Sequence, residues 1–312
     1  MKKISIWGKP MSKISNAVRT GSRLFKNIFP QALFVVSLVM LGSVKAQEFE
    51  AGNKIQVRII STVNKNLSGL FEYSYKVISL PSSRQDIWNF LVVFNFPKDS
   101  IIRASAVLGW WGPDIPVNVE PPYWVSWTGP GSAKVKPGWS KDGFRFETSI
   151  LPGITDFYTE GYHEAPNFPE GMAPDSIPGY TNLTPYGPGI VGKTVGPVLP
   201  PEPFVALAFL DTLASYKHQA ASLGWVGQEE FLKQLNEKLE QSRDQLSKGH
   251  IKQARDKIEE FVKKLENEAK KTEKDQDKKN DKKWVTSEGH ALLKFNAEYL
   301  IEKLDEQITK KK

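Results

Sequence analysis

The sequence predicts two folded parts of different class: an all-β part built as an antiparallel β-sandwich and an all-α part built as a four-helix bundle. Between about residues 54 and 154, apolar residues alternate with polar ones at period two, as in strands with one buried face. From residue 204 onward, apolar residues recur at steps of three and four, as in amphipathic helices. Residues 164–203 hold ten prolines and six glycines and interrupt both patterns.

Residues 1–46 have the composition of an export signal. A basic stretch precedes the apolar run Ala32–Leu41, and the small residues of Val44-Lys45-Ala46 follow it. This order is typical of a cleaved secretory signal peptide. A membrane-spanning helix needs about 20 apolar residues, and this run has about half that number. We therefore expect a secreted or cell-envelope protein with no membrane span in the mature chain.

The charge balance argues against a nucleic-acid partner. The chain has 42 Lys and Arg against 35 Asp and Glu, but residues 1–46 hold eight of the basic residues and no acid. The remainder has 34 basic groups against 35 acidic ones, so it lacks the basic face that binding to phosphates requires. The absence of cysteine excludes disulfides, thiolate zinc sites, a cysteine nucleophile and a lipid-modified cysteine anchor.

Residues 47–163 are predicted to form the β-sandwich. Ile55–Val63 and Leu70–Ile78 alternate regularly and are separated by a turn-rich bridge, which is typical of a hairpin. Ile87–Phe96 has the strongest strand pattern in the chain. Regular short strands without helices between them favour a sandwich. Further strands are expected near Ile101–Leu108, Tyr123–Trp127 and Gly143–Ile150.

Residues 164–203 are predicted to form an extended strap that lies over a domain surface. Proline removes backbone donors and fixes φ, so neither a helix nor a central strand is expected here. The apolar and aromatic residues of the segment argue against a free linker.

Residues 204–312 are predicted to form the four helices. Apolar stripes mark all four helices. They include Leu210 and Leu213 in the first helix, Leu235 and Leu239 in the second, Ile258, Phe261 and Leu265 in the third, and Leu293, Ala297, Leu300, Leu304 and Ile308 in the last. A charged loop, Thr272–Lys283, is expected before the last helix. The expected helices run from Phe204 to Ser222, from Gly227 to a C-terminal Gly249, over Ile251–Leu265, and from Thr286 to Ile308.

This helical part resembles the FIMAH-type domain found near the C-terminus of many secreted bacterial proteins. The resemblance covers about residues 204–308, and the charged loop is longer than such a domain leads us to expect. It implies export and an accessory, interaction-type role, and it supplies no catalytic residues. More loosely, Glu72–Val77 and Ile87–Phe90 are similar to β-domains of exported bacterial proteins of unknown function. The FIMAH-type resemblance rests on Leu223-Gly-Trp225, Leu239, Leu246, Gly249, Ala254, Phe261-Val262 and Ala291–Ile301.

Aromatic residues in Gly/Pro-rich surroundings are the candidate ligand-binding residues. We expect Trp110, Trp111, Tyr123 and Trp124 to contribute an exposed platform, because flat rings stack on sugars. The alternative is that all four belong to the sandwich core or plug its loops, since large aromatic residues dominate cores.

A secreted polysaccharide hydrolase is the alternative function. A glycosidase needs two carboxylates about 5–10 Å apart. The region Glu147–Glu164 also contains Asp156 and Glu160, with Asp142 just before it, but their spacing compels no pair to face each other. Solvated loop carboxylates are the simpler interpretation.

The sequence predicts no cofactor, although it leaves calcium open, because oxygen ligands in loops have no fixed spacing. Gly187–Thr194 fits the phosphate-loop pattern, but the prolines that follow prevent the helix that would bind phosphate. The four histidines, His163, His218, His250 and His290, lie in separate segments.

We therefore predict an exported, non-catalytic binding or scaffolding protein of the cell surface or extracellular matrix. The β-domain is the expected ligand platform, and carbohydrate or another extracellular protein is the expected partner.

If the export signal is cleaved as predicted, secreted material begins at Gln47. Intact-mass spectrometry of the secreted protein checks this directly. Secreted material that retains residues 1–46 would contradict it.

Overall fold

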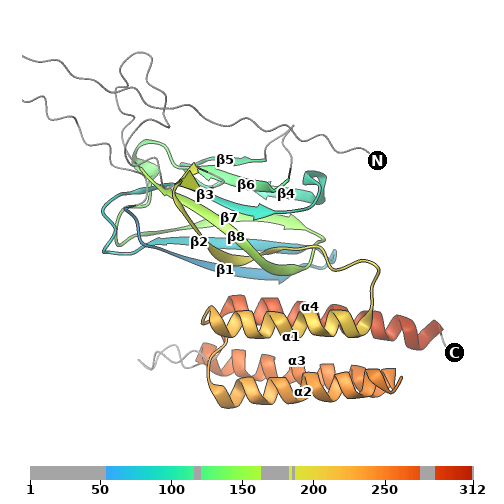
Figure 1. Cartoon of the computed structure of the whole chain (residues 1–312). Helices are drawn as coiled ribbons and strands as arrows, with labels where there is room; N and C mark the ends of the chain where they lie inside the picture. Colours follow the sequence, from blue (N-terminus) through green and yellow to red (C-terminus); the bar gives the residue numbers. More distant parts are fainter. Residues whose placement is uncertain (1–53, 116–120, 163–182, 185–186, 275–284, 311–312) are drawn as a thin grey trace, which may run out of the picture. The chain divides into compact units, whose positions relative to one another are not determined.

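The computed structural model describes residues 54–115, 121–162, 183–184, 187–274 and 285–310 (Figure 1). The predicted export signal therefore lies outside the described residues, as do all of residues 163–182. The chain divides into two units, residues 1–47 and residues 48–312, and the second contains both the strands and the helices. The strands are β1 (Val57–Lys65), β2 (Phe71–Ser79), β3 (Ile87–Phe94), β4 (Ile101–Ser105), β5 (Trp111–Asp114), β6 (Tyr123–Thr128), β7 (Ser140–Thr148), β8 (Pro152–Gly161), β9 (Leu183–Thr184), β10 (Gly187–Pro188) and β11 (Ile190–Pro197).

Two antiparallel sheets form the predicted sandwich. One has four strands in the order β1-β2-β7-β4, and the other has five in the order β11-β8-β3-β6-β5. Alternate residues of β2, beginning with Phe71, are buried, as expected for a strand with one face on the core. Aromatic rings fill the space between the sheets. Phe90 stacks on Trp127 of the same sheet. It also makes an edge-to-face contact with Phe144, which belongs to the opposite sheet, with the ring centroids 5.2 Å apart. The predicted sandwich is confirmed.

The expectation that Asp156 and Glu160 are loop carboxylates is wrong. Both lie on β8, which pairs with β3 on one side and with β11 on the other. The strand starts with Pro152-Gly153 and carries two carboxylates, Asp156 and Glu160, so its sequence resembles a turn followed by a polar loop. Its inward residues, among them Phe157, nevertheless reach the core.

Part of the predicted strap belongs to the sheet. Residues 190–197 form β11, whose eight residues all pair with β8. The sequence excludes a central strand here, and β11 is indeed an edge strand, which needs ladder hydrogen bonds on only one side. Its proline, Pro197, is the last residue of the strand.

The four predicted helices are present. Each packs against two neighbours, so that α1 contacts α2 and α4, and α3 contacts α2 and α4. The predicted stripe residues Leu213, Leu239, Phe261 and Leu300 are all buried. Among the described residues, no helix has the length and apolar character to cross a membrane. The helices are α1 (Ala206–Ser222), α2 (Glu229–Ser247), α3 (Ile251–Lys274) and α4 (Ser287–Lys310).

Helix α4 also packs against the open edge of the sandwich, where β1 and β11 are the edge strands of the two sheets. The backbone N–H of Ser61 donates to Glu288 Oε1 at 2.9 Å, and Asn296 Nδ2 donates to the carbonyl of Pro152 at 2.7 Å. Phe295 meets Phe71 edge to face at 5.2 Å. We call this contact the seam. Helix α4 therefore packs on two sides, against α1 and α3 of the bundle and against the sandwich.

Replacing Glu288 tests the seam. Glu288→Ala leaves the buried N–H of Ser61 without an acceptor, which costs about 1–3 kcal/mol in the free energy of unfolding. Glu288→Gln keeps a side-chain carbonyl at the same place, so its loss should be clearly smaller. Urea unfolding measures both.

The matched control is Glu237→Ala, which removes an exposed glutamate of α2. Equal losses for Glu288→Ala and Glu237→Ala would mean that the Ser61–Glu288 bond contributes nothing to stability.

Candidate ligand-binding site

The structure separates the neighbouring tryptophans Trp110 and Trp111. Trp110 is buried, and its Nε1 donates to the carbonyl of Ala133 at 2.8 Å. Its ring lies against Gly129, where a Cβ would come within 2.7 Å of a ring carbon. Trp111, by contrast, is 67% exposed at the start of the edge strand β5. Only the second ring is therefore available to a ligand.

Tyr123 and Trp124 point to opposite faces of β6, because successive strand residues alternate. Tyr123 stacks on Phe94 of the core at 5.9 Å. Trp124 packs on the outer face of the five-stranded sheet against a small apolar cluster that includes Leu91 and Tyr158. The four predicted platform residues therefore do not form one surface, and Trp111 is the exposed one among them.

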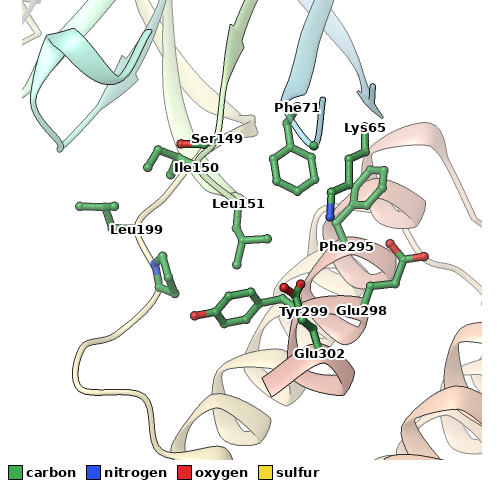
Figure 2. Close-up of a pocket in the computed structure, with 12 residues that line it drawn as sticks. Lys65, Phe71, Ser149, Ile150, Leu151, Leu199, Phe295, Glu298, Tyr299 and Glu302 are labelled. Atoms are coloured by element: carbon green, nitrogen blue, oxygen red, sulfur yellow. The ribbon is translucent and has the colours of Figure 1, made fainter. Parts of the chain in front are cut away.

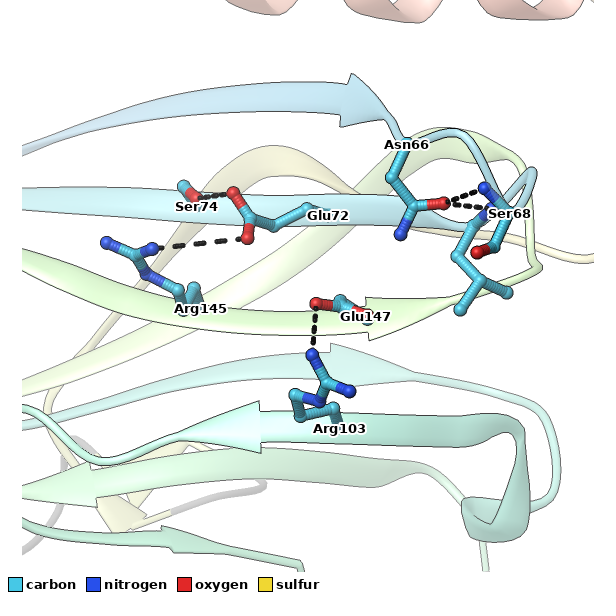
Figure 3. Close-up of polar contacts among 8 residues, drawn as sticks. Asn66, Ser68, Glu72, Ser74, Arg103, Arg145 and Glu147 are labelled. Carbon is cyan, nitrogen blue, oxygen red and sulfur yellow. Dashed lines mark hydrogen bonds and ion pairs between the residues drawn. The ribbon is translucent and has the colours of Figure 1, made fainter.

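The carboxylates of the four-stranded sheet form ion pairs across its outer face (Figure 3). Arg103 Nη1 lies 3.5 Å from Glu147 Oε1, and Arg145 Nη1 lies 4.0 Å from Glu72 Oε2. Cross-strand pairs of opposite charge are typical of a solvated sheet face. Glu147 is therefore held by a structural ion pair.

Asp156 and Glu160 lie on the other sheet. Lys193 Nζ is 2.5 Å from Asp156 Oδ1, and the Tyr158 hydroxyl is 3.1 Å from Glu160 Oε2. Because four residues of a strand span roughly 13 Å, the two carboxylates are too far apart for a glycosidase pair. The described carboxylates of the predicted hydrolase region thus lie on two different sheets or far apart on one strand, while Glu164 lies outside the described residues.

The phosphate-loop pattern falls on strands. Lys193 and Thr194 belong to β11, so their backbone groups take part in a ladder with β8 and no helix follows them. Within the described part of the chain, no group of three His, Asp or Glu side chains is placed to hold a metal ion. His163 lies outside it.

A cavity opens at one end of the seam and has a volume of about 310 Å³ (Figure 2). Three aromatic rings line it, from Phe71 of the sandwich and from Phe295 and Tyr299 of α4. Charged groups stand among them: the Lys65 ammonium lies 5.4 Å from the centroid of the Phe71 ring, and Glu298 and Glu302 project from successive turns of α4. The remaining lining residues are Gly69, Ser149, Ile150, Leu151, Leu199 and Pro200.

The cavity perturbs the ionisation of its own side chains. Burial raises the pKa of the Glu298 carboxyl above its ordinary value, and Lys294 and Lys65 only partly oppose this effect. Burial likewise raises the pKa of the Tyr299 hydroxyl. A half-buried carboxylate beside apolar rings is incompletely hydrated, so it favours a ligand that supplies a hydrogen-bond donor.

A shallower groove of about 600 Å³ continues from the cavity along α4. It shares Glu298 and Glu302 with the cavity and adds Asp305 and Glu306. Both added carboxylates have partners, since Arg255 Nε lies 2.9 Å from Asp305 and Lys303 Nζ lies 2.9 Å from Glu306. Glu302 is therefore the carboxylate best placed for a ligand that spans the two hollows.

Sequence reasoning missed this site, because its residues come from four distant segments around Lys65, Ile150, Leu199 and Phe295. The sequence did contain one indication of an aromatic surface here. Phe295 and Tyr299 lie one turn apart in the last helix, and neither belongs to the apolar stripe predicted for that helix.

Comparisons with known proteins identify a family model that matches the helical part of the chain. Residues 210–302 match the model of the FIMAH domain, which confirms the resemblance of the helical part. The comparison with curated proteins gives no match. Among solved structures, the chain is similar to an uncharacterized protein from Nocardia farcinica that is described as having an immunoglobulin-like fold. The two share 14% identity over 46% of this chain and 98% of that chain, with a TM-score of 0.24.

The raised pKa of Glu298 predicts a pH-dependent effect of Glu298→Gln. The folded protein holds the proton of this carboxyl more tightly than the unfolded chain, so ionisation destabilises the fold as the pH rises through the folded-state pKa. Glutamine imitates the protonated form. We expect the variant to have the same melting temperature as the wild type at pH 3.5 and a higher one at pH 7.

Glu237→Gln, an exposed change on α2, corrects for the loss of one surface charge. A Glu298→Gln variant that is less stable than the wild type at pH 7 would contradict the prediction.

Proposed function

We propose that this chain is an exported, non-catalytic binding protein of the cell surface or extracellular matrix, and that its ligand occupies the cavity at the end of the seam. The observation that carries the proposal is the lining: three aromatic rings with one ammonium and two carboxylates, formed jointly by the sandwich and α4. Ligand sites are typically apolar hollows with a few convergent polar groups.

A saccharide unit is the ligand class that this lining favours. The half-buried rings of Phe295 and Tyr299 offer faces and edges for the apolar side of a sugar, and the buried Phe71 supports Phe295 from behind. Glu298 and Glu302 can accept hydrogen bonds from its hydroxyl groups, and Lys65 can donate one. A volume near the lower end of the usual range for ligand pockets suits one or two rings of a longer chain.

A polysaccharide hydrolase with carboxylates in the region Glu147–Glu164 remains the alternative function. Binding has the better support, because Glu147 and Asp156 are held in ion pairs on separate sheets. The FIMAH-type resemblance, which brings no catalytic residues, also favours binding.

A glycan array followed by calorimetry tests the proposal. The secreted protein should bind a saccharide, and Tyr299→Ala should weaken binding at least about tenfold, since loss of one ring contact and its buried area removes roughly 1.5 kcal/mol or more. Glu302→Gln should also weaken binding.

Glu237→Gln and Trp111→Ala are the controls, because neither residue lines the cavity. Loss of binding in Trp111→Ala with unchanged binding in Tyr299→Ala would move the site to the β-domain platform. Release of reducing ends from the bound glycan would favour the hydrolase.

A further inference from the structure

The two ends of the sandwich differ in chemistry. Strand registers place the β1–β2 turn beside Thr148, because Phe71 pairs with Thr148. The cavity, which includes Gly69 and Ser149, is therefore at this end. The opposite end holds the start of β7, since Ile78 pairs with Ser140.

The opposite end carries three large apolar side chains in solvent. Leu108 is 90% exposed, and Trp111 and Trp139 are each 67% exposed. They come from residues 106–111 and residues 129–141, which we call the tip loops. Two hydrogen bonds join these loops, from Trp110 Nε1 to the carbonyl of Ala133 at 2.8 Å and from Lys141 Nζ to the carbonyl of Leu108 at 2.9 Å.

The exposed residues of the first tip loop have no role in packing the sandwich. Val107 and Trp110 already fill the core beneath it, and both are buried. Leu108 and Trp111 stand directly beside them and contribute nothing to that core. Gly112, at φ +104°, holds the backbone so close to β6 that a Cβ would lie 2.6 Å from the carbonyl oxygen of Ser126. The backbone at Trp111 is thereby anchored while its ring stays outside.

The charge of the tip loops is positive. Residues 106–111 and 129–141 contain Lys134, Lys136 and Lys141 and no carboxylate, although Asp114 and Asp142 follow directly. Lys136 is exposed, while the ammonium of Lys134 lies over the ring of Tyr162. Exposed apolar side chains with basic neighbours at one end of the sandwich complement a surface that is apolar inside and anionic outside.

We propose that the tip loops dock onto an anionic lipid bilayer. Leu108, Trp111 and Trp139 enter the boundary between headgroups and acyl chains, and the exposed Lys136 faces the lipid phosphates. Leu108 favours a bilayer over a glycan, because a leucine has no flat face to stack on a sugar. Tryptophan also suits a bilayer, because it is enriched at membrane–water interfaces. This site is distinct from the cavity at the other end of the sandwich.

Vesicle co-sedimentation of the secreted protein tests the proposal. Binding is expected to vesicles of phosphatidylglycerol and phosphatidylcholine, with weaker binding to phosphatidylcholine alone. Leu108→Ser should lower the partition coefficient about tenfold or more, and Trp111→Ser by at least as much. Lys136→Glu should weaken binding to the anionic vesicles only.

Leu67→Ser is the matched control. Leu67 is fully exposed in the β1–β2 turn at the cavity end, and Asn66 Oδ1 holds that turn by accepting from Ser68 and Leu70 (Figure 3). This variant should partition like the wild type, and all variants should keep the wild-type melting temperature because the changed side chains are exposed.

Three outcomes would overturn the proposal: no binding of the wild type to anionic vesicles, an equal loss in Leu67→Ser and Leu108→Ser, or vesicle binding unchanged in Trp111→Ser while glycan binding is lost. The first two do not bear on the cavity, which Tyr299→Ala tests separately. The third, together with unchanged glycan binding in Tyr299→Ala, would also move the glycan site to the β-domain platform.

Discussion

The seam between α4 and the open edge of the sandwich is the contact on which the other features depend. An edge strand presents unpaired backbone groups, which proteins protect by covering the edge. Here Glu288 of α4 accepts the N–H of Ser61 on β1, across 227 residues of sequence. Asn296 bonds the carbonyl of Pro152 and the carbonyl of Leu292 in its own helix. These bonds form only when both parts are folded, so the seam couples a β-sandwich and a helical bundle into one unit.

The seam also explains where the cavity lies. Close packing holds from Glu288 to Asn296, where buried polar groups meet their partners. One turn further, Tyr299 and Glu302 belong to the same helix but have reached the β1–β2 turn, where the sandwich ends. Where a helix continues past the end of a sheet, its side chains pack against the other helices but no longer against the sheet. The cavity and the adjoining groove lie on the side of α4 that the sheet leaves open.

Much of this fold follows from local patterns, and the misses have identifiable causes. Leu239 and Phe261 were predictable as core residues because their stripes repeat at steps of three and four. Strand β8 was missed because Pro152-Gly153 at its start and the carboxylates Asp156 and Glu160 give it the composition of a turn and a loop. The cavity could not be predicted, since no local pattern relates Lys65 to Tyr299. Trp110 and Trp111 show most directly where prediction from local sequence fails. They share one Gly/Pro-rich context, which does not indicate which of the two rings packs against Gly129.

The distance between the two ends of the sandwich bears on how the proposed sites would work together. Strand β2 has nine residues, so it spans roughly 30 Å from the tip-loop end to the cavity end. The Debye length at physiological ionic strength is about 8 Å, so the field of an anionic surface at the tip loops is largely screened before it reaches the cavity. The carboxylates Glu298 and Glu302 would therefore keep their affinity for a ligand while the opposite end contacts a negatively charged bilayer. A cavity placed among the tip loops would instead bring those carboxylates against the lipid phosphates. The separation of the carboxylate-lined cavity from the basic, apolar end would thus allow one small sandwich to serve both proposed sites.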